Sequence, residues 1–315
     1  MSAPLVSVIC LCYNHELFLR EALESVVDQT YKNIEIIVVD DCSKDNSVTI
    51  IQEFIKRYPE IRFISNADNI GNCRSFNKAF QLSRGSYIID FATDDVMYPD
   101  KIEKQVAALE QAGGSYGVVY SDAAVIDERG KFLYNHFDNL NRYKLKEIPQ
   151  GDIYKILLEK FFLPTTTMLV RREVLEELGG YDESLTYEDF DFWIRSSRNW
   201  KYLYVPEVLN KRRLSTYSFS NQFLYSSTTM HWSTYRVCQK ALWLNKTKEE
   251  NEALLKRVEA EMKTCYFLNQ FDLVIQYNEL LKSAHLKSSS TTLWTILSRL
   301  KIPMYWFYKL YKKIR

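Results

Sequence analysis

The chain has 315 residues, and its 41 lysines and arginines against 40 aspartates and glutamates give a formal net charge of +1. This balance argues against a nucleic-acid binder as a whole. The length is typical of two domains, or of one α/β domain with an appendage, and the 46% hydrophobic content is enough for a packed core. None of the six cysteines forms a Cys-x-x-Cys pair, which favours reduced, buried thiols in a cytosolic protein. No apolar run is long enough to span a bilayer, and the N-terminus lacks the basic region of a signal peptide.

The first hundred residues alternate predicted strands and helices. Four apolar, β-rich runs are predicted strands: residues 5–12, 34–39, 61–64 and 87–92. Apolar residues at helical spacing predict a helix after each of the first three, and Asn14 is placed to cap the first helix. This alternation predicts a mostly parallel, doubly wound sheet, which binds ligands beyond the carboxyl ends of its strands. Tyr13, Asp41 and the pair Asp94–Asp95 all fall at such ends.

Asp94 and Asp95 follow the fourth predicted strand, and Pro99 marks the start of the next helix. Two adjacent carboxylates raise each other's pKa unless a divalent cation makes the pair favourable. The pair therefore predicts a site for a divalent metal. The alternative is that both acids only cap the helix that begins near Pro99.

The second half of the chain is less regular. Three strands are predicted, at residues 117–126, 165–170 and 202–205, and two short helices, at 153–158 and 173–178. Residues 127–150 read as a polar loop and residues 210–213 as a basic loop. The acidic and aromatic run 187–193 opens a further helix, and its acids either form a partly buried site or lie at the positive end of the helix dipole. From about residue 222 the pattern is helical, which predicts an α/β domain over 1–220 and a helical region over 221–315.

The C-terminal tail is basic and aromatic. No acid follows Glu279, whereas eight lysines and arginines do, and residues 293–311 interleave them with Trp, Ile, Leu and Phe. Such a segment suits the headgroup region of an anionic membrane. The alternative is a terminal helix that packs on the rest of the protein or on a second subunit, which leaves a homo-oligomer open.

Seven motifs in order resemble the family 2 glycosyltransferases of the GT-A fold. They are Val6–Ile9 with Tyr13–Asn14, Gln29–Tyr31, Glu35–Asp41, Asn69-x-Gly71, Gly85–Ile88, Thr93–Asp95 and Glu188–Asp189. The resemblance covers residues 4–215. It implies that a sugar is transferred from a nucleotide-diphosphate donor with inversion at the anomeric carbon.

The resemblance also implies a role for each polar cluster. Tyr13 and Asp41 would hold the nucleotide base, with a packed rim residue and a turn former as the respective alternatives. Asp95 would be the direct ligand of the metal, which the resemblance specifies as Mn²⁺ or Mg²⁺, and Asp94 would contact the ribose or the metal through water. Asp189 would be the catalytic base that takes the proton of the acceptor hydroxyl.

Some assignments stay open within the resemblance. Arg212 or Arg213 resembles the family's flexible basic loop that closes over the diphosphate, although a solvated surface run fits as well. Arg74 is a further candidate for that cation, because Phe76 stands where the family often has arginine. Glu188 and Asp191 are rivals of Asp189, since residues one or two apart on a helix point in different directions.

The predicted function is an inverting, metal-dependent glycosyltransferase of the cytoplasm or the inner face of the cell membrane. It would move a sugar from a UDP- or dTDP-sugar to a glycan or lipid-linked glycan in surface polysaccharide biosynthesis. A nucleotidyltransferase would need a glycine-rich phosphate loop, which residues 11–15 lack. A non-catalytic carbohydrate-binding or scaffold protein on the same fold is the other alternative.

Overall fold

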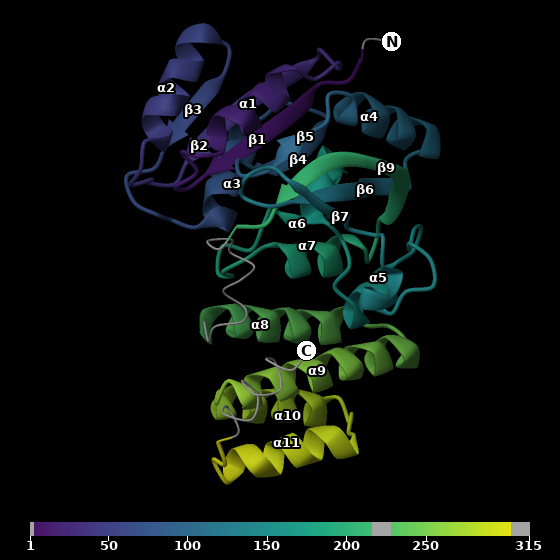
Figure 1. Ribbon diagram of the computed structural model, residues 1–315. Helices are drawn as coiled ribbons and strands as arrows, with labels where there is room; N and C mark the ends of the chain where they lie inside the picture. The colour runs from purple at the N-terminus through teal and green to yellow at the C-terminus, as the bar shows by residue number, and fades with distance from the viewer. Residues whose placement is uncertain (1–2, 216–227, 304–315) are drawn as a thin grey trace. The chain divides into compact units, whose positions relative to one another are not determined.

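In the computed structural model, residues 3–215 and 228–303 are described (Figure 1). The chain divides into two compact units. The first unit comprises the chain up to residue 153 together with 162–192 and 196–216, and the second comprises 154–161, 193–195 and the chain from 217 onward. The predicted domain boundary at 220 falls within residues 216–227, outside the described ranges, and stays a prediction.

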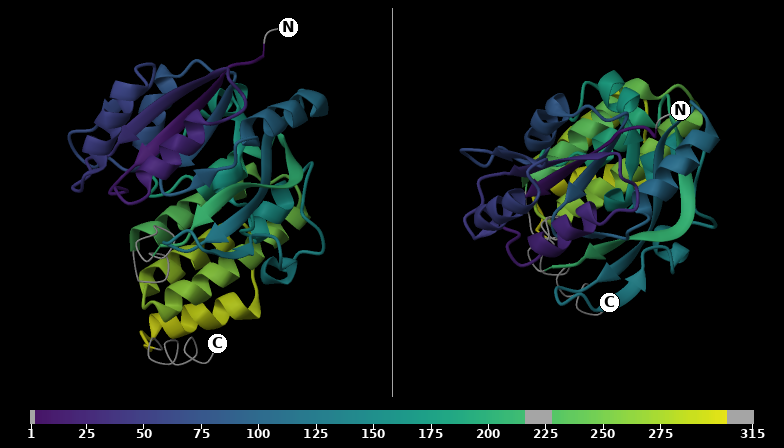
Figure 2. Two further views of the ribbon diagram at one scale, coloured as in Figure 1. Left: turned by 45° about the horizontal axis from the view of Figure 1, so that its top comes forward. Right: turned by 90° about the horizontal axis from the view of Figure 1, so that it is seen from above.

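The first unit begins with a parallel half-sheet. Its strands are β1 (Val6–Cys12), β2 (Ile34–Asp40), β3 (Arg62–Ser65) and β4 (Tyr87–Ala92), in the order β3-β2-β1-β4. The connecting helices are α1 (Leu19–Val27), α2 (Ser47–Arg57) and α3 (Asn72–Leu82) (Figure 2). All three strand pairings are parallel, so the predicted alternation of strands and helices is confirmed.

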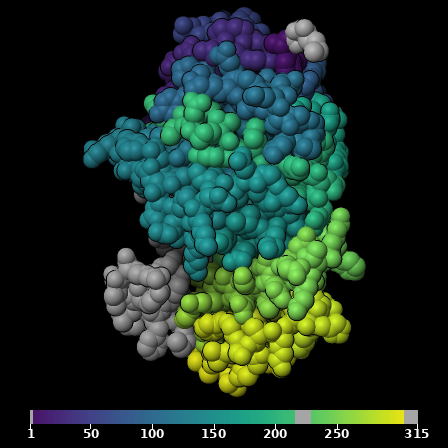
Figure 3. Space-filling view, turned by 90° about the vertical axis from the view of Figure 1, so that its right-hand side faces the viewer, coloured from purple at the N-terminus to yellow at the C-terminus, as the bar shows by residue number. Residues whose placement is uncertain are grey.

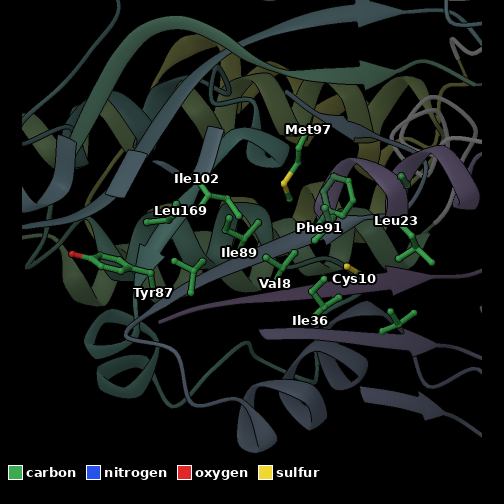
Figure 4. Close-up of a cluster of buried hydrophobic side chains, with 14 of the residues drawn as sticks. Val8, Cys10, Leu23, Ile36, Tyr87, Ile89, Phe91, Met97, Ile102 and Leu169 are labelled. Atoms are coloured by element: carbon green, nitrogen blue, oxygen red, sulfur yellow. The ribbon is translucent and has the colours of Figure 1, made fainter. Parts of the chain in front are cut away.

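Strand alternation explains why both faces of this half-sheet are covered. Val8, Cys10, Ile89 and Phe91 share one face and pack with residues of α1 and of α4 (Lys101–Ala112) (Figure 4). The residues between them point the other way, where α3 contacts β1 and β2. Cys10 is a buried free thiol, as expected for a reduced protein.

The second half of the sheet is mixed. Its strands are β5 (Val96–Met97), β6 (Tyr116–Ile126), β7 (Phe132–Asn135), β8 (Leu169–Arg171) and β9 (Lys201–Arg213). The order continues from β4 as β8-β6-β9-β5, with β7 paired to β6. The short strand β8 runs antiparallel to both β4 and β6, while β6 and β9 are parallel. Around these strands lie α6 (Arg172–Leu178), α7 (Asp189–Ser196) and two 3-10 turns, η1 (Leu140–Tyr143) and η2 (Thr165–Thr167).

Four local predictions were wrong. Residues 165–170 are not one strand, because η2 precedes β8, and the polar loop 127–150 contains β7 and η1. Residues 210–213 are not a loop, because they complete β9 and pair with β5 and β6. Asn14 does not cap a helix, since α1 begins only at Leu19 and the Asn14 side chain accepts a bond from the Lys44 N–H.

The second unit is helical. Its helices are α5 (Tyr154–Glu159), α8 (Thr228–Leu244), α9 (Lys248–Phe267), α10 (Phe271–Ser283) and α11 (Ser289–Arg299). Helix α5 joins the others through a 2.7 Å hydrogen bond from Tyr154 to Asn245. The Arg257 guanidinium lies 3.8 Å from the centre of the Phe161 ring. Among the described residues, no helix is long and apolar enough to cross a membrane.

Candidate functional site

The carboxyl ends of three neighbouring strands meet at one edge of the sheet. The Asp41 N–H donates to the Cys12 carbonyl at 2.9 Å, which joins the end of β2 to the end of β1. On the other side of β1, the Thr93 N–H donates to the Leu11 carbonyl at 3.1 Å. The chain therefore presents Tyr13, Asp41 and the Asp94–Asp95 pair along one edge, as predicted for a doubly wound sheet.

Asp41 is buried and already accepts three hydrogen bonds. They come from Asn66 Nδ2 at 3.0 Å and from the N–H groups of Ile70 and Gly71, both at 2.9 Å. These bonds hold the turn that leads into α3, where Gly71 has a φ of 86°. A carboxylate has roughly four acceptor positions, so Asp41 keeps capacity for a further donor. Tyr13 is 44% exposed beside it, and the roles of both residues toward a nucleotide base stay predictions.

The negative charges of Asp94 and Asp95 disfavour each other. Asp95 is buried, and its Oδ1 accepts a 2.8 Å bond from the Arg213 N–H. Burial and the neighbouring Asp94 charge raise the pKa of Asp95 to about 7. Burial also raises the pKa of Asp94, against the opposing charges of Arg213 and Arg212. The site therefore favours a positive charge beside these carboxylates.

Arg213 is a buried structural residue. Its guanidinium donates to the Asp94 carbonyl at 2.9 Å, pairs with Glu21 at 2.7 Å and lies 4.6 Å from the centre of the Phe18 ring. Two longer bonds reach carbonyls in the turn after β6. The expectation of a mobile basic loop that includes Arg213 is thus corrected, because strand pairing and these contacts fix the side chain.

Arg212 differs from its neighbour. It is only partly buried, and within residues 3–215 and 228–303 its guanidinium has no hydrogen-bond or ion-pair partner. Its charge lowers the pKa of Asp94, Asp95 and Asp189 against the effect of burial. Arg212 is therefore the cation that the structure leaves available near all three carboxylates.

The 3-10 turn η2 connects the carboxylate pair with Asp189. Burial raises the pKa of Asp189, and a hydrogen bond from the Thr165 side chain opposes this rise. The next residue, Thr166, opposes the rise in the pKa of Asp95, although its buried Oγ1 makes no hydrogen bond to any described residue. Consecutive threonines of one turn therefore act on two carboxylates that are 94 residues apart in sequence, and the turn itself contacts β4 and β9.

Asp189 begins α7, and one of its carboxylate oxygens is buried. No described residue donates a hydrogen bond to its Oδ1, which is a costly arrangement that a bound ligand would relieve. The neighbouring Glu188 accepts a 2.6 Å bond from Asn72 at the start of α3, and burial raises its pKa well above the usual value. Asp191 is buried at 1% exposure. The raised pKa of Asp189 has the direction expected for a base at neutral pH.

Arg74 is not drawn into this arrangement. Its side chain is 56% exposed and makes a 3.8 Å ion pair with Glu183, whose side chain is 51% exposed. An exposed pair of this kind contributes little. In the described part of the chain, no contact joins Arg74 to Asp41, Asp94 or Asp95.

The donor set fits a divalent cation that shares its ligands with a substrate. Among the described residues, no group of three or more His, Cys, Asp and Glu side chains could hold a metal by itself. Mg²⁺ typically uses one or two carboxylates and fills its remaining positions with phosphate oxygens and water. Asp94 and Asp95 match this pattern. Oδ1 of Asp95 already accepts the Arg213 N–H, and the second oxygen of Asp95 remains for a metal.

Several residues around the site carry no sequence signal of their own. Thr93 accepts or donates a 2.9 Å bond with Nδ1 of His15, and burial lowers the pKa of His15 to about 4. Thr165, Thr166 and Asn72 come from distant segments that only the fold brings together. Thr93 is the exception, because it belongs to the sequence motif Thr93–Asp95.

Comparison with known proteins identifies the family. Residues 7–179 match the family model described as Glycosyl transferase family 2. An uncharacterised glycosyltransferase of Methanocaldococcus jannaschii is 34% identical over 243 residues, covering 74% of this chain and 81% of the relative. One of Haemophilus influenzae is 30% identical over 306 residues, covering 94% and 85%. The chain therefore belongs to glycosyl transferase family 2, which confirms the resemblance read from its motifs.

Two solved structures have a similar fold. Residues 1–349 of S. aureus TarS, in complex with UDP-GlcNAc, match with a TM-score of 0.69 at 16% identity, covering 94% of this chain and 87% of that one. The mannosyltransferase PcManGT from Pyrobaculum calidifontis, in complex with GDP-Man and Mn²⁺, matches with a TM-score of 0.61 at 15% identity, covering 95% and 85%. The predicted fold class, a GT-A domain with C-terminal helices, is confirmed.

Proposed function

We propose that this protein transfers a sugar from a nucleotide-diphosphate donor to a glycan or lipid-linked glycan acceptor, with inversion and with dependence on Mn²⁺ or Mg²⁺. The observation that carries the proposal is that Asp189 and Asp95 both lie near the 3-10 turn η2. The side chains of Thr165 and Thr166 lower the pKa of Asp189 and of Asp95, so a candidate base and a candidate metal carboxylate lie near one turn, which contacts β4 and β9. The charge of Arg212 acts on both.

Each group then has a chemical task. A divalent cation held by Asp95, with Asp94 beside it, would supply positive charge to the diphosphate as it leaves. Arg212 would neutralise the same developing charge. Asp189 takes the proton of the attacking acceptor hydroxyl, and its unpaired Oδ1 is the atom available for that bond. Inversion follows when the acceptor attacks from the face opposite the diphosphate.

The donor is proposed to be a UDP- or dTDP-sugar. A pyrimidine ring N–H would donate to Asp41, and the exposed ring of Tyr13 would stack on the base. Two proteins of similar fold are bound to donors with different bases, UDP-GlcNAc in one complex and GDP-Man in the other. The assay therefore compares donors with different bases. The acceptor is proposed to belong to surface polysaccharide biosynthesis.

The test is sugar transfer and donor hydrolysis measured with UDP-, dTDP- and GDP-sugars, each with and without Mn²⁺. We expect release of the nucleoside diphosphate from a pyrimidine donor only when metal is present. Pyrophosphate release from a nucleoside triphosphate would instead support a nucleotidyltransferase. Saturable sugar binding without turnover on any donor would support a non-catalytic carbohydrate-binding protein.

Helix α11 supports a membrane role for the C-terminal region. Its polar residues Thr291 and Ser298 are buried against its neighbours, whereas Leu293, Ile296 and Leu300 are 50%, 52% and 65% exposed. A helix in a globular fold normally buries its apolar face. Figure 3 shows the C-terminal helices in yellow.

The sequence around α11 is basic, which favours an anionic lipid surface as the partner of this stripe. Trp306 and Phe307, which belong to the predicted membrane segment, lie outside the described residues. Flotation with phosphatidylglycerol vesicles should carry the wild-type protein upward. Replacing Leu293, Ile296 and Leu300 by Ser should reduce recovery at least tenfold, because about 5 kcal/mol of apolar burial is lost.

The matched control is Trp243→Ser, since Trp243 is 89% exposed on α8 and lies outside the stripe. A chain ending at Ser290 should float no better than the triple variant. Equal flotation of all four proteins would exclude the membrane role. A concentration-dependent dimer that the triple variant abolishes, without any flotation, would assign the stripe to a second copy of the chain.

A further inference from the structure

Lys101, the first residue of α4, is a fully buried cation. Its exposure is 0%, and its Nζ donates to Gln105 Oε1 at 2.6 Å and to the Thr167 carbonyl at 3.2 Å. Within residues 3–215 and 228–303 it has no carboxylate partner. Burial lowers its pKa to about 7, which reflects the absence of a compensating charge.

This placement is unfavourable for stability on two counts. An ammonium group taken out of water costs several kcal/mol unless an anion accompanies it. The first turn of a helix is also the positive end of its dipole, where a cation is disfavoured. An apolar residue of similar length would avoid both costs, so what the lysine adds at this position is its pair of hydrogen bonds to Gln105 and to the Thr167 carbonyl.

The Lys101 ammonium is linked to η2 directly and through Gln105. The Thr167 carbonyl accepts from Lys101 and also from Gln105 Nε2 at 2.6 Å. The Thr167 hydroxyl accepts from the Ser121 N–H at 3.2 Å and donates to the Pro164 carbonyl at 2.7 Å. Helix α4 and strand β6 thus fix the last residue of the turn. The two residues before it are Thr165 and Thr166, whose side chains lower the pKa of Asp189 and of Asp95, and the turn contacts β4, the strand that leads into Asp94 and Asp95.

We propose that Lys101 is a positioning residue for the transfer reaction: it anchors the Thr167 carbonyl and so holds η2 in the place that sets Asp95 and Asp189 relative to each other. This inference rests on the proposed function of those carboxylates. The Lys101 ammonium does not itself touch the substrate, because it lies on the buried side of the turn. A small displacement of η2 would shift both carboxylates at once, and misplacement by about 1 Å can lower a rate about 100-fold.

The test compares Lys101→Met with the control Lys104→Met. Lys104 lies one turn along the same helix, with a side chain that is 36% exposed and ion-paired to Asp100. We expect Lys101→Met to lower kcat about 10- to 100-fold while KM for the donor and the affinity for the nucleoside diphosphate change less than about threefold. Its thermal midpoint should equal or exceed that of the wild type, because a buried charge has been removed. Lys104→Met should match the wild type in all four measurements.

A second variant covers the case in which Lys101→Met does not fold. Gln105→Met removes one of the two bonds to the Thr167 carbonyl and leaves Lys101 in place, so we expect a kcat about five- to tenfold lower with unchanged nucleotide affinity. A kcat within twofold of the wild type in the folded variants would overturn the inference. A loss of stability with unchanged kcat in the folded fraction would overturn it too, since that is the signature of a structural lysine. Failure of the wild type to transfer sugar would instead refute the proposed function.

Discussion

Replacing Arg213 by Met separates a structural arginine from a diphosphate-binding one. The strong bond to the Asp94 carbonyl is worth about 2 kcal/mol, and each of the two longer bonds about 0.5 kcal/mol. The ion pair to Glu21, whose side chain is 51% exposed, adds about 0.5 kcal/mol after solvent screening. Contact with the Phe18 ring adds about 0.5 kcal/mol. The loss totals about 4 kcal/mol, or about 8–16 °C in the thermal midpoint of a unit of this size.

The matched variant is Arg212→Met. Because Arg212 has no partner in the described part of the chain, its loss should change stability by less than about 0.5 kcal/mol. A contact between Arg212 and a diphosphate would be worth about 1.5–3 kcal/mol, so KM for the donor should rise at least about tenfold. Thermal melts and donor titrations of both variants decide the matter. If Arg213→Met melts like the wild type and loses donor binding, while Arg212→Met behaves normally, the reasoning is wrong.

Three further outcomes are expected. Asp189→Asn should lower kcat by a factor of about 10²–10⁴ with donor binding intact, while Asp191→Asn lowers it far less; the reverse order would move the base to Asp191. Asp95→Ala should abolish transfer with little change in the thermal midpoint, and wild-type activity that survives EDTA would contradict the metal role. Burial, with the charges of Arg212 and Arg142, lowers the pKa of His136 to about 4, so the folded state binds this proton less readily than the unfolded state. Stability should therefore fall as pH drops from about 6.5 to 4. His136→Gln should flatten that fall and the exposed His285→Gln should not; equal pH profiles would refute the assignment.

The local pattern of the chain was enough to predict the parallel half of the sheet. In β1 and β4 a short, β-branched and apolar run can only be buried on both faces, and the helices between the strands show their own spacing. The carboxyl ends of such strands converge by topology alone. The places of Tyr13, Asp41 and Asp94–Asp95 on one edge therefore followed from sequence, and so did the family.

Partners distant in sequence were decided only by the tertiary structure. Arg212 and Arg213 read alike as a basic run, yet strand alternation in β9 turns Arg213 inward to Glu21 and leaves Arg212 near the carboxylates. Lys101 looks like an ordinary helix residue, and its burial under η2 depends on how α4 packs beside β6 and β8. A single sequence carries periodicity and local chemistry, but the pairing of one segment with another depends on contacts that local pattern does not encode. That is why the edge that holds the site could be predicted, while the turn that joins Asp95 to Asp189 could not.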